Sequence, residues 1–465
     1  MMRFSRVIVP AVAALLLASP VSAQLLGGGG PVGGVVGGVM GTAGNTMGQV
    51  GNTVGGVVGG PGSGALGSVT GPFSNGLNGL GFNGIPPSLD SVSGPPGLSF
   101  ASPMEIENYR EARLRALIEA NRAVLDRDEN GQPVRKRELI ATNPDAASLA
   151  IAASSGFQVI GDEQEAQLGI RLVTLAIPKG MNVRQALKAI RRAAPAMQVD
   201  FNHIYEPSGG ALVPVAGAAL AVSPAVAGRT RIAMIDGGIA SHPALAHASI
   251  EQRGFAGDAQ PTGHGTAVGS LLVGDQGPFR GAARGAQLFV GDVYGGNPAA
   301  GSVTSILRAL SWAASKNPSV INISLVGPNN TALARAIDAL RGRGIQIVAA
   351  VGNDGPAAPP QYPASYPGVV SVTGVDAQGR ALHEAGRAAH LDFAAPGADM
   401  IAAFPGKGYT TVRGTSFAAP LAAARLALTG SYQRLAQEAQ PGEGKVGHGI
   451  VCAACRVDPR VIRRK

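Results

Sequence analysis

The sequence has few aromatic residues, few charges and only two cysteines. Aromatic residues make up 4% and charged residues 14% of its 465 positions, whereas glycine occurs 68 times and proline 33 times. This skew indicates that part of the chain is a low-complexity segment. Two cysteines cannot supply a framework of disulfides, so any folded part must rely on a hydrophobic core. With 45% hydrophobic residues, the chain can bury such a core and has room for two domains.

The two cysteines, Cys452 and Cys455, form the string Cys-Ala-Ala-Cys near the C-terminus. In an exported chain a disulfide across this short loop is the first expectation, although such a loop is easily strained. A zinc site would need further ligands, which the neighbouring sequence does not offer. A redox role would need a thioredoxin-like context, which is absent. We therefore assign the pair no catalytic role.

Long uninterrupted apolar runs are also lacking, so no membrane-spanning helix is predicted. The apolar run at residues 7–18 is too short to span a bilayer. It follows Arg3 and Arg6 and precedes the small residues that end at Ala23. This arrangement is typical of a secretory signal peptide over residues 1–23, with cleavage after Ala23. The sequence therefore predicts a protein that is secreted or periplasmic.

The net charge of +9 would suit an anionic partner such as nucleic acid. Basic residues are mixed with acidic ones over residues 105–140, however, and only the tail at residues 456–465 forms a compact basic patch. The sequence contains no basic stripe interleaved with aromatic residues and no recognisable nucleic-acid module. We therefore predict no nucleic-acid partner.

Residues 24–103 form the low-complexity segment, which is rich in Gly, Val and Pro. The string VGGVVGG begins at Val32 and again at Val54. The segment has too few large side chains to offset the entropy cost of ordering, so disorder or a flexible spacer is predicted. A role in surface attachment or self-association is the alternative, since Val-containing glycine repeats can stack as β structure.

The composition of a folded domain begins at residue 104. Apolar residues with charges between them predict an exposed amphipathic helix over residues 105–128. Further patterns predict a strand, a strand, a helix and a strand, at residues 157–160, 168–177, 183–193 and 199–205. We thus expect a small α+β domain over residues 104–206. An Ala-, Val-, Gly- and Pro-rich linker follows at residues 207–228.

Three polar residues stand at positions typical of a catalytic site. Asp236 ends a buried strand-like run, and open parallel sheets place their sites at such carboxyl ends. His264 lies between two glycines, where its imidazole is accessible and suits proton transfer near neutrality. Ser416 precedes an apolar helix whose first N–H groups have no intrahelical partners. Taken singly, these motifs also fit a turn, a solvated loop and a helix cap.

Asn353 is a fourth candidate, in the string Gly-Asn-Asp-Gly after an apolar strand-like run at residues 345–351. A carboxamide can donate a hydrogen bond to a developing oxyanion without titrating. By itself the string is more typical of a plain turn. It gains weight only beside the other three motifs.

Four strings of this sequence resemble the active-site motifs of subtilisin-like serine proteases. RIAMIDGGI, HGTAVGSLLVG, AAVGNDG and GTSFAAP resemble the motifs of the catalytic aspartate, the catalytic histidine, the oxyanion-hole asparagine and the catalytic serine. The chain order Asp, His, Ser is also that of the subtilisin triad. The family usually has Ser or Thr after the aspartate. Gly237 stands there in this chain and removes one possible hydrogen bond near the carboxylate.

The resemblance implies acyl transfer. His264 would take the proton of Ser416, which attacks a peptide carbonyl, while Asp236 orients the imidazolium. The side chain of Asn353 and the backbone N–H of Ser416 would stabilise the oxyanion. Substrate would add as an extended strand along two segments. These segments comprise Ser324, Leu325, Val326 and Gly327, and Tyr294, Gly295 and Gly296.

The resemblance also implies a fold, namely a three-layer α/β peptidase domain around a mostly parallel sheet at residues 229–430. The domain at residues 104–206 would be a propeptide, with self-cleavage at or after Tyr205, and residues 431–465 would be a C-terminal tail. No cofactor is expected. No metal is expected either, because the path from His264 to Val293 lacks an acidic ligand cluster.

The sequence therefore predicts an exported serine endopeptidase whose partners are peptide substrates and its own propeptide domain. The alternative from another class is a noncatalytic surface or adhesion protein, in which the Gly-rich segment does the work on a protease-like scaffold. A processing protease that cuts only one partner protein is a third hypothesis.

Overall fold

The computed structural model describes residues 102–208, 212–215, 229–406 and 408–460. The predicted signal peptide, most of the Gly-rich segment and most of the predicted linker lie outside these residues. Among the helices that are described, none has the length and apolar character needed to cross a membrane.

The first described element is helix α3 (Pro103–Ala120). Ser102 caps it, because its hydroxyl accepts the N–H of Glu105 while the Glu105 carboxylate accepts the N–H of Ser102. The sequence predicted a helix as far as residue 128, but the helix ends at Ala120. The side chain of Asn121 donates back to the Leu117 carbonyl, and the chain then turns into a strand.

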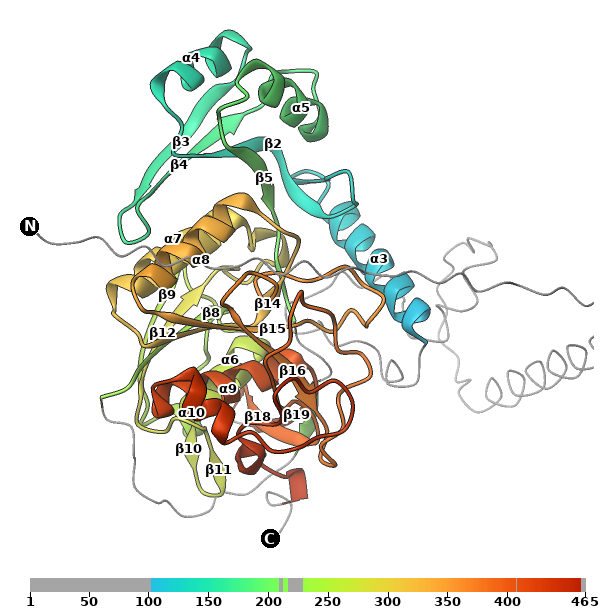
Figure 1. Cartoon of the computed structure of the whole chain (residues 1–465), viewed down its shortest axis with the longest axis vertical. Helices are drawn as coiled ribbons and strands as arrows, with labels where there is room; N and C mark the ends of the chain where they lie inside the picture. The colour runs from blue at the N-terminus through green and yellow to red at the C-terminus, as the bar shows by residue number, and fades with distance from the viewer. Residues whose placement is uncertain (1–101, 209–211, 216–228, 407, 461–465) are drawn as a thin grey trace, which may run out of the picture. The chain divides into compact units, whose positions relative to one another are not determined.

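A five-stranded antiparallel sheet follows α3. Its strands are β1 (Leu125–Arg127), β2 (Pro133–Thr142), β3 (Gln158–Glu165), β4 (Ile170–Ala176) and β5 (Val199–His203). Helices α4 (Ala146–Ser154) and α5 (Val183–Ala193) pack together over it, as Figure 1 shows. The predicted helix at residues 183–193 is confirmed with the same bounds, and its apolar face is buried. Strand β2, which pairs with β1, β4 and β5, was not predicted from the sequence.

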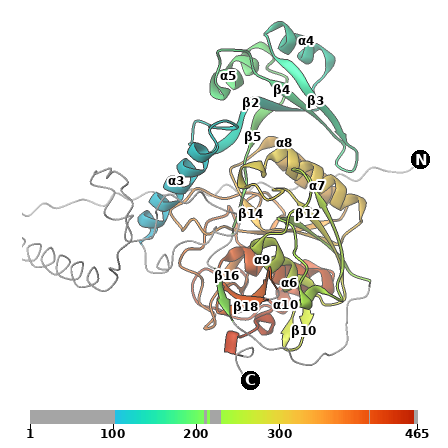
Figure 2. The same ribbon diagram turned by 180° about the vertical axis from the view of Figure 1, so that it is seen from behind.

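The larger of the two described domains is an α/β domain around a seven-stranded parallel sheet. In spatial order the strands are β17 (Phe393–Pro396), β16 (Val370–Val375), β15 (Gln346–Ala350), β13 (Val320–Ile323), β8 (Arg231–Asp236), β12 (Gln287–Asp292) and β9 (Ser249–Gly254). Helices α6 (Gly263–Val273) and α9 (Thr415–Thr429) cover one face, and α7 (Val303–Ser315) and α8 (Thr331–Gly342) cover the other (Figures 1 and 2). The predicted three-layer α/β fold is confirmed.

The central strands are apolar on both faces because helices cover both sides of the sheet. In β8 every residue from Ile232 to Asp236 is buried, and all four residues of β13 are buried. Parallel strands align their carboxyl ends at one edge of the sheet. Asp236, Ser324 and Asn353 all lie at or just after those ends, which brings residues far apart in sequence to one edge.

Smaller sheets involve the segment that joins the two domains. Strand β6 (Glu206–Pro207) pairs antiparallel with β14 (Leu325–Val326), and β7 (Leu212–Val215) pairs antiparallel with β19 (Gly408–Val412). Strand β18 (Met400–Phe404) completes the second of these sheets, and β10 (Asp275–Gln276) with β11 (Phe279–Arg280) forms a hairpin. The predicted linker therefore contributes to β6 and to β7, the strands before and after residues 209–211, which are not among the described residues.

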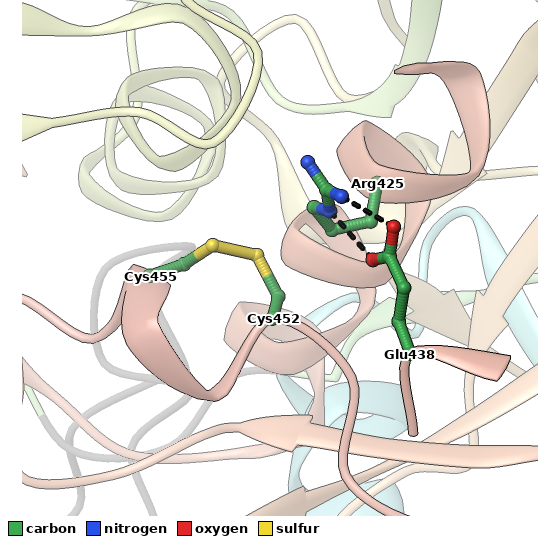
Figure 3. Close-up of a disulfide and its surroundings, with 4 residues drawn as sticks. All are labelled: Arg425, Glu438, Cys452 and Cys455. Carbon is green, nitrogen blue, oxygen red and sulfur yellow. Dashed lines mark hydrogen bonds and ion pairs between the residues drawn. A yellow bond between two sulfur atoms is a disulfide. The ribbon is translucent and has the colours of Figure 1, made fainter. Parts of the chain in front are cut away.

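The C-terminal tail packs onto α9. It contains α10 (Tyr432–Gln437) and the short 3-10 helix η4 (Ala453–Cys455). The expected disulfide joins Cys452 and Cys455, and Cys452 belongs to the hydrophobic cluster around α9 (Figure 3). Nearby, the Arg425 guanidinium donates two hydrogen bonds to the Glu438 carboxylate, at 3.0 and 2.6 Å. The pair fixes the end of α10 to α9.

Candidate active site

Three side chains from three different elements meet at the carboxyl edge of the sheet. Asp236 ends β8, His264 lies in the first turn of α6, and Ser416 lies in the first turn of α9. The His264 Nδ1 atom lies 2.8 Å from Asp236 Oδ1, and its Nε2 atom lies 2.9 Å from Ser416 Oγ. All three residues are buried, with exposed fractions of 2% or less. The structure thus brings the three predicted residues into a chain of acid, base and nucleophile.

The start of α6 is held close to the end of β8. Thr262 caps the helix by accepting the N–H of Gly265 at 2.9 Å. A Cβ atom on Gly265 would lie 2.2 Å from the Gly237 carbonyl oxygen, so only glycine allows this approach. The approach brings His264, which lies between the cap and Gly265, within reach of Asp236.

The two oxygens of the Asp236 carboxylate differ in their contacts. Oδ1 accepts hydrogen bonds from His264 Nδ1 and from the Gly237 N–H, the latter at 2.7 Å. Oδ2 is buried without a donor among the described residues. A Cβ atom on Gly237 would lie 2.4 Å from Thr262 Oγ1, so the Thr262 side chain fills the space that a larger residue would need. The packing of Thr262 against Gly237 therefore leaves no room for a serine or threonine side chain beside Asp236.

Asn353 is held by the start of α9 and faces the chain's own backbone. Its Oδ1 accepts the Thr415 N–H at 2.9 Å, which leaves its Nδ2 to donate to the carbonyl oxygen of Ser208. The Ser416 N–H donates to the same oxygen at 3.4 Å. The two groups predicted to stabilise an oxyanion thus converge on one carbonyl, that of Ser208.

The residues before Ser208 occupy the strand site that was predicted for substrate. Pro207 pairs with Leu325 and Glu206 pairs with Val326 in antiparallel register, and the Ser208 N–H donates to the Ser324 carbonyl at 3.0 Å. An extended segment therefore runs along β14 and delivers its carbonyl to Asn353 and Ser416. The segment belongs to the chain itself.

The Tyr205 side chain is fully buried beside this strand. Its ring lies against Gly327, where a Cβ atom would come within 2.7 Å of Tyr205 Cδ1. Its hydroxyl donates to the Pro328 carbonyl, and its own carbonyl accepts from the Tyr294 hydroxyl at 3.1 Å. Burial raises the pKa of the Tyr205 hydroxyl well above its ordinary value. Tyr205 is therefore bound as a neutral, fully enclosed side chain.

The second segment that was predicted to pair with substrate comprises Tyr294, Gly295 and Gly296, and its arrangement differs from that expectation. The Tyr205 N–H donates to the Gly301 carbonyl at 2.8 Å. Gly295 packs against the Ala256 backbone, and Gly296 packs against Gln260. Tyr294 and Gly327 thus contact the bound segment, whereas Gly301, which was not among the predicted site residues, supplies the backbone acceptor.

Asp292 is a buried carboxylate that was not among the predicted site residues. It pairs with Asp236 across β12 and β8, and it accepts the N–H groups of Gln260, Tyr294 and Gly295 at 2.8 to 3.0 Å. Burial raises its pKa. Asp292 holds the loop that carries Tyr294. The strand-ending pattern that pointed to Asp236 also occurs at Asp292 and could have indicated it.

Three further histidines, His203, His242 and His390, contact groups away from the site. The His203 ring lies 3.3 Å from Asp128, and the rings of His242 and His390 bond to backbone carbonyls at 2.7 and 2.8 Å. Within the described ranges, no group of three or more His, Cys, Asp or Glu side chains is arranged to hold a metal ion.

Comparisons with known proteins agree with this geometry. Residues 228–453 match the model of the Subtilase family, Peptidase_S8. The chain is 34% identical to Subtilisin Savinase of Lederbergia lenta over 208 residues, which cover 43% of this chain and 75% of that protein. It is 31% identical to the major intracellular serine protease of Bacillus subtilis (strain 168), over 46% of this chain and 73% of that protein.

A solved structure has the same fold. Fervidolysin from Fervidobacterium pennivorans superposes with a TM-score of 0.57 at 19% identity, over 69% of this chain and 61% of that chain. Together with the matches in sequence, the fold defines a subtilisin-like serine endopeptidase. The chain belongs to the subtilase family of serine proteases.

The close packing of Gly237 against Thr262 gives a testable expectation. Gly237→Ser should displace the Thr262 hydroxyl from its cap and lower the free energy of unfolding by roughly 1–3 kcal/mol. Thermal and denaturant unfolding, both measured in a Ser416→Ala background to prevent self-digestion, would check this.

The matched control is Thr262→Ala, alone and combined with Gly237→Ser. Because both changes act at one contact, the double variant should lose clearly less stability than the sum of the two single losses. Additive losses, or a Gly237→Ser variant as stable as the parent, would contradict the packing argument.

Proposed function

We propose that the chain is the precursor of an exported serine endopeptidase, which cuts its own backbone after Ser208 and then hydrolyses other peptides. One observation carries the proposal, namely that the Ser208 carbonyl oxygen accepts from Asn353 Nδ2 and from the Ser416 N–H. A peptide carbonyl bound by these donors lies where the Ser416 hydroxyl can attack it.

The reaction follows from the hydrogen bonds of His264. Its Nδ1–H donates to Asp236, so Nε2 is free to accept the proton of Ser416 Oγ as that oxygen attacks the Ser208 carbonyl carbon. The buried Asp236 carboxylate stabilises the resulting imidazolium. The oxyanion keeps the two donors that the carbonyl oxygen already has.

Collapse of the tetrahedral intermediate breaks the bond to Gly209. His264 gives its proton to the leaving amide nitrogen, and an ester between Ser416 and Ser208 remains. A water molecule that loses its proton to His264 then attacks the ester. The products are a carboxyl group at Ser208, an amine at Gly209 and the free Ser416 hydroxyl.

Anchors on both sides of the bond favour self-cleavage. Upstream, β6 pairs with β14, and downstream, β7 pairs with β19. The described residues on both sides of the bond are therefore paired with strands of the peptidase domain. The expectation of cleavage at or after Tyr205 narrows to the bond between Ser208 and Gly209.

Residues 102–208 would then remain bound as an inhibitory propeptide. The Asp200 carboxylate accepts the backbone N–H and the hydroxyl of Thr331 at the start of α8, each at 3.0 Å. Asn330 donates to the Phe201 carbonyl at 2.9 Å, and Arg308 bonds to both carboxylate oxygens of Glu163. None of these contacts depends on the bond after Ser208, so its hydrolysis leaves them intact.

Export is inferred from residues 1–23, which carry the charged start, the short apolar run and the small residues of a signal peptide. Deletion of residues 2–23 should keep the protein in the cytoplasm, whereas the full chain should reach the periplasm or the medium. Cell fractionation followed by immunoblotting measures this. An equal distribution of the two forms would contradict export through this segment.

Replacement of the nucleophile tests the enzymatic proposal. Ser416→Ala should leave the full chain uncut and lower peptide hydrolysis by about 10⁴-fold or more, because no ester can form. A fluorophosphonate probe should label the matured parent at Ser416 and leave the variant unlabelled. Unchanged proteolysis in purified Ser416→Ala, or a parent that the probe does not label, would favour the noncatalytic surface protein.

The cleavage site is a separate expectation. N-terminal sequencing and mass spectrometry of the matured protein should give a new N-terminus at Gly209. Tyr205→Ala should slow self-cleavage roughly tenfold or more, since it removes the ring that fixes the segment. Tyr205→Phe keeps the ring and should slow it only about a few-fold. A mature protein that begins elsewhere would refute the assignment of Ser208.

A further inference from the structure

Glu206 carries a buried carboxylate in the strand that lies along β14. It is the third residue before the bond that follows Ser208, and its side chain is 12% exposed. Burial raises the pKa of Glu206, while the Arg113 guanidinium opposes this effect. A negative charge at this position is therefore costly without a cation beside it.

The cation comes from helix α3. One nitrogen of Arg113, Nη2, lies 3.2 Å from Glu206 Oε2 and 3.1 Å from Asp354 Oδ1. Asp354 directly follows the oxyanion donor Asn353, and its side chain is 11% exposed. A single guanidinium thus bridges two buried carboxylates, one on the bound segment and one on the peptidase domain.

The position of α3 on this part of the domain is fixed by a second contact. Ile106 is 1% exposed, and a Cβ atom on Gly355 would lie 2.9 Å from Ile106 Cγ2. The apolar side of α3 therefore packs on the residue next to Asp354. Arg113 reaches Asp354 from a helix that is seated there independently of the ion pairs.

The charged groups that act on Glu206 come from two sources. Arg113 and Arg110 belong to α3, and Asp354 belongs to the peptidase domain. The two arginines would leave with the propeptide, while Asp354 would stay. A peptide that enters the same strand site afterwards would meet Asp354 without Arg113.

We propose that Asp354 selects the charge of the third residue before the scissile bond. It favours Lys or Arg and disfavours Asp or Glu. The chain's own Glu206 is accepted at this position because the Arg113 guanidinium lies between it and Asp354. A basic side chain at that position replaces the Arg113 guanidinium beside Asp354. An acidic one brings two carboxylates together with no cation between them.

The inference rests on the proposed function, and peptide kinetics test it directly. The substrates are peptides with Tyr-Xaa-Pro-Ser before the scissile bond, in which Xaa is Lys, Gln or Glu. The enzyme is the full chain after it has processed itself and its propeptide has been degraded or separated, so that the strand site is open to the peptide. At low salt, kcat/KM should fall in the order Lys, Gln, Glu, with Lys preferred over Glu by roughly tenfold or more.

Asp354→Asn should bring the ratio of Lys to Glu close to one. The matched control is Asp338→Asn on α8, which removes an exposed charge outside the site and should keep the parental ratio. A parental ratio near one, or an unchanged ratio in Asp354→Asn, would overturn the inference. Failure of the proposed function looks different, because then even the Gln peptide would stay uncut.

The role of Arg113 is tested in the full chain. Arg113→Gln should slow self-cleavage after Ser208 roughly tenfold, and adding Glu206→Gln to it should restore most of the rate, because no second buried carboxylate then faces Asp354. A role of Arg113 in folding α3 alone would give no such rescue. If Arg113→Gln cut itself at the parental rate, or if adding Glu206→Gln did not restore the rate, Arg113 would not be what allows Glu206 to lie beside Asp354.

Discussion

The two hydrogen bonds of the His264 imidazole depend on three separate parts of the fold meeting at one edge of the sheet. Asp236 arrives on β8, His264 on α6 and Ser416 on α9. The parallel sheet aligns the strand end, and glycine at position 265 lets α6 come close to it. Small residues matter as much as polar ones here, because a shift of about 1 Å in any element would break the hydrogen bonds that join Asp236, His264 and Ser416.

Much of this site could be predicted because its signals are local. Asp236 ends an apolar run, and His264 and Ser416 stand in short strings rich in small residues, so each signal lies within about ten residues of sequence. The buried face of α5 could be predicted equally well from the helical spacing of its apolar residues. These features reflect physical requirements of one segment and its immediate neighbours.

The features that escaped prediction depend on partners far away in sequence. Strand β2 contains Arg135, Lys136 and Arg137, whose charges hide its alternation, and it forms because β4 and β5 pair with it. Strand β6 contains a proline and exists only through its pairing with β14. Asp354 looked like a turn residue, since its partner Arg113 comes from a different domain. Propensity carries no information on such pairings.

In the proposed reaction the first peptide bond that Ser416 cuts, the one after Ser208, belongs to the same molecule, and the strands before and after it, β6 and β7, pair with strands of the peptidase domain. Its effective concentration is set by connectivity and does not fall on dilution. Activation by this proposed route would be a first-order process, whereas every later cut would be bimolecular. By the proposed route a newly made molecule would mature even when it is alone, and its rate of maturation would measure a property of its own fold.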